Sequence, residues 1–252
     1  MKILKVMSLL LDYPETSLAE FEDELLCVVR ASGLAREHQT AVEAFLDKRS
    51  RGDLMDWQME YDGLFERGRS LSLHLFEHVL GESRDRGQAM VDLMNQYKQA
   101  GLEIDALELP DYLPLYLEFL STQGEANARL GLQEISHILA LLTCRLQKRD
   151  SNYQALTHAL LSLSGAQVDL DSVREQIAQE KRDDTKEALD KVWEEEAVTF
   201  GADKSDDACG SAVNKPSETQ RRDDYLPINW TQNAGDTADS VTDSTALAQR
   251  GV

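Results

Sequence analysis

The chain has no hydrophobic run close to the roughly 20 residues that a membrane-spanning helix needs. Its first residues, MKILKVMSLLLDYPE, contain no small-residue cleavage site and become acidic at once, unlike a secretory signal peptide. We therefore expect a cytoplasmic protein with no direct insertion into a membrane.

Cysteine is scarce. Cys27, Cys144 and Cys209 form no CxxC pair, and an odd number of cysteines spread over the whole chain is a poor disulfide framework. Cys27 and Cys144 fall within apolar helical patterns, so we expect both to be buried, inert thiols. Reduced thiols agree with a cytoplasmic location.

Positive charge is also in short supply. The 26 Lys and Arg residues face 46 Asp and Glu residues, which gives a net charge of -20. Such a field repels phosphate backbones and anionic lipid surfaces, so nucleic acid is not an expected partner. The same field attracts a basic peptide or a basic protein terminus.

Complete nucleophile, phosphate-binding and redox motifs are missing as well, so we expect a binding protein rather than an enzyme, with no resident cofactor. The strongest catalytic pattern is HLFEH at 74–78, which matches the HxxEH motif of inverted zinc peptidases. There His74 and His78 would bind zinc and Glu77 would activate water. No clear third ligand follows and the flanking leucines are typical of helix packing, so a zinc hydrolase is kept only as the alternative.

The pattern that dominates the chain is helical. From residue 2 to about residue 200 nearly every segment has the 3.6-residue period, and no convincing run of alternating β-branched residues occurs. This predicts an all-α fold, a single-domain compact helical bundle with short connections. The two most regular apolar stripes consist of Ile135, Ile138, Leu139, Leu142 and Leu146, and of Met90, Leu93, Met94 and Tyr97. Further helices are expected over about 2–11, 17–31, 37–48, 53–66, 71–80, 111–121, 152–164, 171–180 and 184–198.

The composition changes after Gly201 to Asp, Ser, Thr, Asn, Gly and Ala. Such a segment cannot bury enough apolar surface to offset its ordering entropy. We therefore expect one domain over residues 1–200 and a disordered acidic tail over residues 201–252. The patch DYLPINW at 224–230 could dock on the body or on a partner, although a tail without such contacts is the simpler interpretation.

Two stretches, 61–90 and 108–119, mix aromatic, apolar and charged helix positions in a way that is typical of a binding surface. Asp111 lies at a break where it could cap the helix that starts near Tyr112. Tyr112 and Tyr116 are one helical turn apart and offer aromatic contact groups.

These stretches resemble a known family. The residues that carry the resemblance are LLLDYP at 9–14, LFERGR at 64–69, LFEHVLGESRDRGQAMVDL at 75–93, ELPDYLPLYLEFL at 108–120, RDDT at 182–185 and VWEEEAVTF at 192–200. Over roughly residues 1–200 the chain is similar to the delta-subunit type of nitrate reductase molybdenum cofactor assembly chaperone, among the redox enzyme maturation proteins. The family motif commonly has His after Pro-Asp, where this chain has Tyr112, so an imidazole role at that position is not expected here.

The resemblance implies a chaperone that binds the N-terminal peptide of the apo catalytic (alpha) subunit of respiratory nitrate reductase. It would hold that subunit ready for insertion of the molybdenum cofactor and the iron–sulfur cluster, and it would delay membrane docking. The cofactor-insertion machinery is a further possible partner. The chaperone would be absent from the finished enzyme, and a permanent reductase subunit is the rival interpretation.

We predict that an amphipathic helix of the client lies in a groove with aromatic anchors and acidic groups. The expected client-peptide-binding residues are Phe65, Glu66, Leu75, Phe76, Glu77, His78, Arg84, Pro110, Asp111, Tyr112, Pro114, Tyr116 and Glu118.

Overall fold

The computed structural model describes residues 1–81, 85–104 and 108–196, and for residues 192–196 it places only the helical backbone. These residues belong to one compact unit, Met1–Thr199. The predicted tail over residues 201–252, with its patch at 224–230, lies outside the described residues. The division of the chain near residue 200 therefore stays a prediction.

The described residues form an all-helical fold, which confirms the predicted fold class. In this part of the chain the only β-type pairing is an isolated bridge between His74 and Tyr112. No helix among the described residues has the length and apolar character needed to cross a membrane. The elements are α1 (Lys2–Leu11), α2 (Ser17–Glu20), α3 (Glu22–Arg30), α4 (Arg36–Ser50), α5 (Leu54–Tyr61), the π-helical turn η1 (Asp62–Glu66), α6 (Leu75–Val79), α7 (Asp85–Gln99), α8 (Leu113–Thr122), α9 (Glu125–Glu134), α10 (Ser136–Lys148), α11 (Gln154–Ser164), α12 (Leu170–Ala178) and α13 (Lys186–Glu196).

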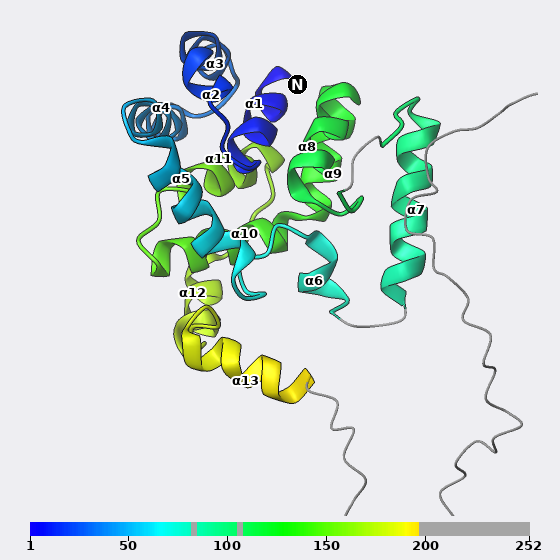
Figure 1. Cartoon of the computed structure of the whole chain (residues 1–252). Helices are drawn as coiled ribbons and strands as arrows, with labels where there is room; N and C mark the ends of the chain where they lie inside the picture. The colour runs from blue at the N-terminus through cyan, green and yellow to red at the C-terminus, as the bar shows by residue number, and fades with distance from the viewer. Residues whose placement is uncertain (82–84, 105–107, 197–252) are drawn as a thin grey trace, which may run out of the picture. The chain divides into compact units, whose positions relative to one another are not determined.

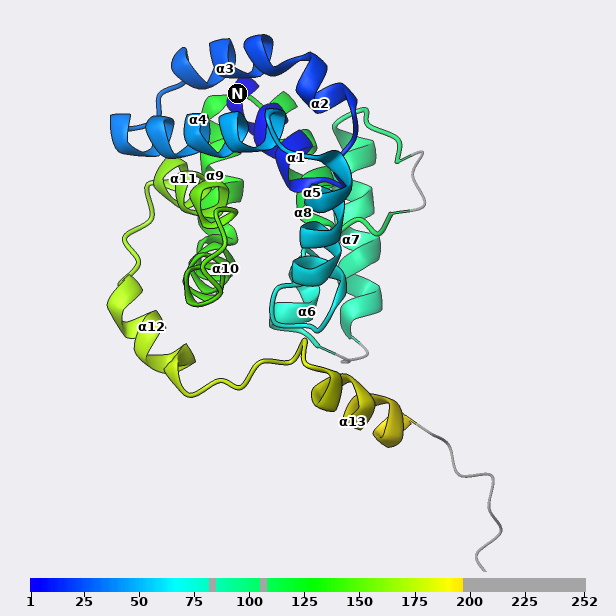
Figure 2. The ribbon, with the colours of Figure 1, turned by 60° about the vertical axis from the view of Figure 1, so that its left-hand side comes forward.

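The core lies where α1 packs along α8 and where α10 packs along α11 (Figure 1). Helix α11 also packs against α4 and α9, so helices from both halves of the chain contribute to the core (Figure 2). The predicted stripe on α10 is buried, with exposed fractions from 0% at Leu139 to 8% at Ile135. Full burial of one leucine side chain stabilises by about 1.5–3 kcal/mol, so this stripe fixes α10 within the core.

The second predicted stripe lies on α7, and it is buried mainly toward the C-terminal end of that helix. Leu93 and Tyr97 are buried, whereas the two methionines of the stripe are half-buried. The Tyr97 ring lies 4.7 Å from the Phe119 ring, centroid to centroid, and its hydroxyl donates a hydrogen bond of 2.7 Å to the Pro110 carbonyl oxygen. These contacts hold the end of α7 beside α8.

Helix α9 was not predicted, because its sequence lacks a large apolar stripe. Its buried residues are Ala128, Gly131 and Leu132, two of which are small. A Cβ atom at Gly131 would lie only 2.5 Å from the side chain of Leu120. The glycine that lowers the helical signal in the sequence is therefore the residue that lets α9 approach α8.

Two predicted helices also differ from the structure. The segment 17–31 is divided into α2 and α3 at Phe21, and the helix predicted over 71–80 begins only at Leu75. His74, directly before Leu75, is extended, and backbone hydrogen bonds join its two neighbours, Leu73 and Leu75, to residues 111–113. Long-range pairing therefore overrides the local helical pattern there.

The two cysteines within the described residues have different environments. Cys144 on α10 is buried as predicted, but Cys27 on α3 is exposed, so the prediction for Cys27 is wrong. The buried residues of α3 are Leu25 and Val29, which are four positions apart on one face. Cys27 lies midway between them in sequence and therefore faces away from the core.

A charged group lies within the aromatic part of the core. The Arg49 guanidinium is 5.1, 5.5 and 5.2 Å from the ring centroids of Phe45, Trp57 and Tyr153. It also donates two hydrogen bonds, of 2.7 and 2.8 Å, to the carboxylate of Glu60. This cluster joins α4, α5 and the start of α11.

Candidate functional site: a pocket between α6, α8 and α13

A pocket of about 410 Å³ opens where η1, the chain before α6, the start of α8 and the start of α13 meet. Its lining combines apolar or aromatic side chains with acidic groups, one arginine and a histidine. The lining residues are Phe65, Glu66, Gly68, Arg69, Ser72, Leu73, His74, Glu77, Tyr112, Asp183 and Leu189.

The inner side of this pocket is built by two chain segments that run side by side. The Leu75 amide donates to the Asp111 carbonyl oxygen at 2.9 Å, and the Leu113 amide donates to the Leu73 carbonyl oxygen at 2.8 Å. These two bonds form the isolated bridge that places Tyr112 next to His74. Two motifs that are far apart in sequence are thus fixed at one site.

Asp111 is fully buried and links the same two segments through its side chain. Its Oδ2 accepts a hydrogen bond of 3.0 Å from the amide of Phe76, near the N-terminus of α6. Helix α8 has Tyr112 at its N-cap position and no side-chain cap. The sequence interpretation of Asp111 as the cap of α8 is therefore wrong, because the carboxylate caps the neighbouring helix instead.

The His74 imidazole faces the buried carboxylate. His74 Nδ1 lies 3.4 Å from Asp111 Oδ1, which is long for a hydrogen bond but close enough for a strong charge interaction. Contact with Asp111 raises the pKa of His74, although burial acts in the opposite direction. The buried carboxylate of Asp111 therefore favours the protonated form of the His74 imidazole.

His78, the other histidine of the HxxEH pattern, has a separate role. Its Nε2 donates a hydrogen bond of 2.8 Å to the Ser72 carbonyl oxygen, and burial lowers its pKa. Within the described residues, no group of three or more His, Cys, Asp or Glu side chains is placed to hold a metal ion. The two histidines are accounted for by contacts with Asp111 and with the backbone, which gives the zinc alternative no geometric support.

The Tyr112 side chain is held in place by contacts of its hydroxyl group. Its hydroxyl lies 2.9 Å from the Tyr61 hydroxyl and donates to Asp12 Oδ1 at 3.0 Å. Tyr61 in turn donates to the Leu11 carbonyl oxygen at 3.1 Å. The Tyr112 ring thus lines the pocket while its hydroxyl connects α8 to α5 and to the end of α1.

Four of the residues predicted to bind the client line this pocket: Phe65, Glu66, Glu77 and Tyr112. Phe65 is buried and forms the wall, whereas Glu66 is exposed at the rim. The part that each plays in binding stays a prediction.

The other predicted residues lie outside the lining. Leu75, Pro110, Asp111 and Pro114 are buried supports, and Phe76 and His78 are half-buried in α6. Tyr116 points to α9, where its hydroxyl donates to the Gly131 carbonyl oxygen at 3.4 Å, and Glu118 forms an ion pair with Lys5 on α1. Arg84 lies outside the described residues.

The other seven lining residues were not predicted to bind the client, and two of them, Asp183 and Leu189, come from a distant part of the chain. They come from the segment before α13 and from α13 itself, more than 110 positions beyond Ser70, with which Asp183 forms a hydrogen bond. The RDDT motif at 182–185 was visible in the sequence, but nothing in local periodicity connects it to the segment near Phe65.

Comparison with known proteins places this fold in a family. Residues 31–158 match the family described as "Nitrate reductase delta subunit". The chain is 50% identical over 211 residues to the "Nitrate reductase molybdenum cofactor assembly chaperone NarJ" of Escherichia coli (strain K12), covering 83% of this chain and 88% of that protein. It is 46% identical over 227 residues to the "Probable nitrate reductase molybdenum cofactor assembly chaperone NarW" of the same strain, covering 90% and 95%.

These matches extend over most of the chain and over most of both relatives, and they confirm the resemblance found in the sequence motifs. The protein therefore belongs to the nitrate reductase delta subunit family, together with these two assembly chaperones.

Proposed function

We propose that this protein is a cytoplasmic chaperone for the maturation of a respiratory nitrate reductase. The names of its relatives, at 50% and 46% identity, support an assembly role rather than a catalytic one. The client is the apo catalytic subunit, which the chaperone holds while the molybdenum cofactor and the iron–sulfur cluster are inserted. The chaperone leaves before the loaded subunit docks on the membrane part of the enzyme.

The observation that carries the client-binding part is the pocket itself. A cavity of about 410 Å³ is suited to a few side chains from one face of a helix rather than to a whole helix. Phe65, Leu73 and Tyr112 offer apolar and aromatic contact. Negative charge beside them comes from the exposed Glu66 and from Glu77, which also pairs with Arg86 at 3.6 Å. We infer that the N-terminal segment of the client binds as an amphipathic helix, with apolar side chains in the cavity and basic side chains toward the acidic groups.

Reversibility follows from coupled folding and binding. A free N-terminal segment that becomes helical on the chaperone loses about 2–5 kcal/mol of the gross interaction energy to ordering. The complex is then specific yet weak enough to dissociate when the client is mature.

The direct test is calorimetric titration of the full chain with a peptide of about 15–20 residues from the N-terminus of the cognate catalytic subunit. We expect saturable one-to-one binding with a negative heat-capacity change, the sign of apolar burial. A folded protein that does not bind the peptide would contradict recognition through this segment.

A pair of substitutions at Tyr112 separates client contact from structural support. Tyr112→Ala removes the ring from the pocket and should weaken peptide binding by about 1–2 kcal/mol or more if the ring is an anchor. Tyr112→Phe keeps the ring and removes only the hydroxyl with its contacts to Asp12 and Tyr61, so affinity should stay close to that of the native chain. Equal loss of affinity in both variants would mean that the hydroxyl network, rather than the ring, is what binding needs.

The charge contribution is tested with a matched pair of charge reversals. Glu66→Lys changes the pocket rim, whereas Glu24→Lys makes the same change on α3, far from α6 in both ribbon views (Figures 1 and 2). Only the first should slow association and reduce its dependence on ionic strength. Equal effects would show that overall charge, and not the pocket, attracts the client.

The rival interpretation, a permanent subunit, differs in the composition of the mature enzyme. We expect the protein to co-purify with the apo catalytic subunit and to be absent from the cofactor-loaded complex. A stoichiometric amount in the active complex would contradict a chaperone that leaves.

A further inference from the structure

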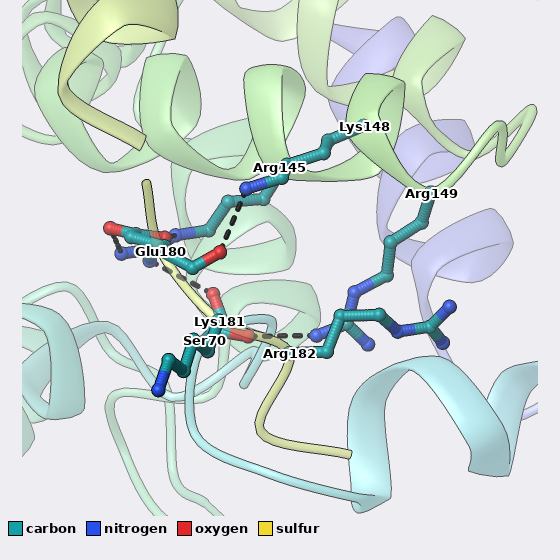
Figure 3. Close-up of a pocket in the computed structure, with 7 residues that line it drawn as sticks. All are labelled: Ser70, Arg145, Lys148, Arg149, Glu180, Lys181 and Arg182. Atoms are coloured by element: carbon teal, nitrogen blue, oxygen red, sulfur yellow. Dashed lines mark hydrogen bonds and ion pairs between the residues drawn. The ribbon is translucent and has the colours of Figure 1, made fainter. Parts of the chain in front are cut away.

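Next to the pocket, the segment 180–184 is fastened to the end of α10 by a cluster of charged side chains. The cluster encloses a small cavity of about 90 Å³, around which Ser70, Arg145 and Arg149 gather together with Glu180 and its neighbours (Figure 3). The RDDT motif at 182–185 belongs to this cluster, and the proposed function has given it no role.

Two cations of the cluster are already bound to the chain itself. Arg145 donates two hydrogen bonds, of 2.9 and 2.8 Å, to the carboxylate of Glu180. Lys148 donates to the carbonyl oxygens of Ile177, Ala178 and Glu180 at 2.8, 3.1 and 2.8 Å, and so satisfies the C-terminal end of α12. This pairing indicates a clasp for the C-terminal part of the fold rather than a site for an external anion.

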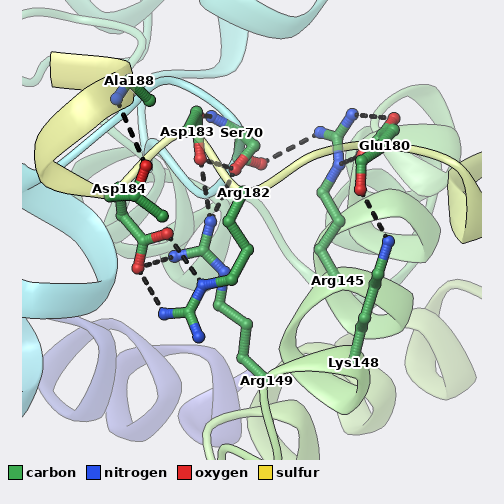
Figure 4. A network of polar contacts seen from close by, with 10 residues as sticks. Ser70, Arg145, Lys148, Arg149, Glu180, Arg182, Asp183, Asp184 and Ala188 are labelled. Carbon is green, nitrogen blue, oxygen red and sulfur yellow. Dashed lines mark hydrogen bonds and ion pairs between the residues drawn. The ribbon is translucent and has the colours of Figure 1, made fainter.

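Asp183 is the centre of the clasp (Figure 4). Its Oδ2 accepts a hydrogen bond of 2.7 Å from the Ser70 amide, and its Oδ1 accepts from the Ser70 hydroxyl at 2.7 Å and from Arg149 Nη2 at 2.9 Å. Arg149 also pairs with Asp184, Nη1 to Oδ2, at 3.1 Å. Gly68 has φ +82, and a Cβ atom there would lie 2.6 Å from the Asp183 carboxyl carbon, so the glycine permits this close approach.

Helix α13 begins directly after the clasp and touches the pocket with one turn. Thr185 Oγ1 accepts a hydrogen bond of 3.2 Å from the Ala188 amide at the start of this helix. Leu189 is half-buried and lines the pocket, whereas Glu187 and Asp190 are exposed. Among the α13 residues whose side chains are described, 186–191, none is fully buried, so this part of the helix is attached to the body mainly by the polar clasp.

We propose that α13 is an intramolecular competitor of the client. The latch of Asp183 with Ser70 and Arg149 holds α13 at the mouth of the pocket, where Leu189 takes a position that an apolar client side chain occupies in the complex. This inference rests on the proposed function, because it concerns the same pocket.

Charge explains why the competitor needs a latch. The α13 sequence KEALDKVWEEE has more acidic than basic residues, and the pocket lining holds three acids, Glu66, Glu77 and Asp183, against the cation Arg69 and the imidazole of His74. An acidic helix is a poor occupant of an acidic pocket, whereas a basic client helix gains from the same field. A short tether gives α13 an effective concentration on the order of millimolar, so weak intrinsic binding suffices for competition and for client release.

The test is the affinity of the full chain for the client N-terminal peptide with and without the latch. Asp183→Ala should release α13 and lower the Kd about threefold to tenfold, because a pocket that is open about a tenth of the time binds about tenfold more weakly. Simple electrostatics predicts a higher Kd instead, because removal of an acidic side chain beside the pocket weakens the binding of a basic peptide. The matched control is Asp171→Ala, which removes an exposed acid of α12 that pairs with Arg174 and should leave the Kd unchanged.

Hydrogen exchange of the amides of residues 186–191 provides a second readout. Exchange should become faster when the peptide binds and in the unliganded Asp183→Ala protein. If that variant does not fold, Ser70→Ala, which removes only one hydroxyl of the latch, decides the question through a smaller change of Kd in the same direction.

The outcomes separate the two proposals. A variant Kd that is unchanged or higher, or greater protection of residues 186–191 in the complex, overturns the competition and leaves the proposed function standing. Absence of peptide binding by both the native chain and the variants overturns the proposed function, and the competition with it.

Discussion

Two arginine side chains, Arg49 and Arg149, are almost equally buried, at 6% and 8% exposure, and each donates charged hydrogen bonds to carboxylates. Arg49 lies among three aromatic rings and joins α4 to α5. Arg149 follows the end of α10 and holds the segment that precedes α13 through Asp183 and Asp184. Similar chemistry thus belongs to the core in one region and to a terminal segment in the other.

The difference shows that the surroundings of an ion pair decide its structural role. A buried pair alone is weak evidence for stability, because desolvation offsets much of the Coulomb attraction. At Arg49, burial of Phe45, Trp57 and Tyr153 accompanies the pair, so the pair opens only when the core unfolds. The segment that Arg149 holds has no fully buried side chain between residues 180 and 191, so local opening without global unfolding is expected there.

Substitution at Arg49 should have the largest effect. Arg49→Ala removes charged hydrogen bonds to Glu60 and Asn152 and leaves space among the rings. Because Glu60 is 34% exposed and stays partly hydrated, we expect the free energy of unfolding to fall by about 2–4 kcal/mol. Urea unfolding followed by circular dichroism measures this change. Arg51→Ala is the control, since Arg51 is 78% exposed in its pair with Asp47 and should matter by less than about 0.5 kcal/mol. A loss below about 1 kcal/mol at Arg49 would erase the contrast between the two regions.

Substitution at Arg149 should have a smaller effect on global stability. Arg149→Ala removes charged hydrogen bonds to Asp183 and to the Ser70 hydroxyl. We expect the free energy of unfolding to fall by about 1.5–3 kcal/mol. Amide exchange of residues 186–191 should increase more than that of α10 or α11. An equal increase in all three segments would indicate that the clasp and the core unfold together.

The Ser70 hydroxyl tests the clasp at the scale of one side chain. Ser70→Ala removes its 2.7 Å bond to Asp183 and its 2.9 Å bond from Arg149, but it keeps the backbone amide bond and the pair of Arg149 with Asp183. A loss of about 0.5–1.5 kcal/mol in the free energy of unfolding is therefore expected in urea. Thr122→Val, which removes an exposed hydroxyl bonded to the Phe119 carbonyl oxygen, should have no measurable effect. Equal losses would mean that the Ser70 bond has no special weight.

A fall in pH should have the smallest effect, but it should still distinguish the Arg49 region from the Arg149 region. Hydrogen bonds from Arg49 lower the pKa of Glu60, and at Asp183 the bonds from Ser70 and the charge of Arg149 lower the pKa, although burial there acts to raise it. Each carboxylate therefore contributes stability that is complete above its unfolded-state pKa, about 4, and is lost as the pH falls through its folded-state pKa.

Protection factors measured from neutral pH downward should fall first in residues 186–191 and later in α10. Asp183→Asn should weaken the pH dependence of the first segment only, and the remaining dependence comes from Asp184, whose pKa is lowered by Arg182 and Arg149. Simultaneous loss of protection in both segments would show that the clasp has no independent opening.

The sequence predicted well those features that depend on local periodicity. The apolar stripe from Ile135 to Leu146 predicted α10 and its buried face, because a 3.6-residue period places those positions on one side of any helix. Prediction from periodicity failed at α9, whose packing relies on Gly131. It also failed at the start of α6, where pairing with residues 111–113 extends the chain. Both failures come from contacts with another segment.

The same distinction holds for the pocket. Phe65 and Tyr112 were predicted from their motifs, and the structure places both in one lining. Leu189 was missed, because no local pattern shows which distant segment a helix turn will contact.

The sequence by itself determined that this protein is helical and acidic, and that it belongs with the assembly chaperones of nitrate reductase, since composition, period and motifs are properties of the chain. Only the tertiary structure decided that Asp111 caps α6 rather than α8 and that Asp183 holds Ser70, 113 positions away. Hydrogen bonds and packing act over a few ångströms in space, and sequence distance carries no information about which groups come that close.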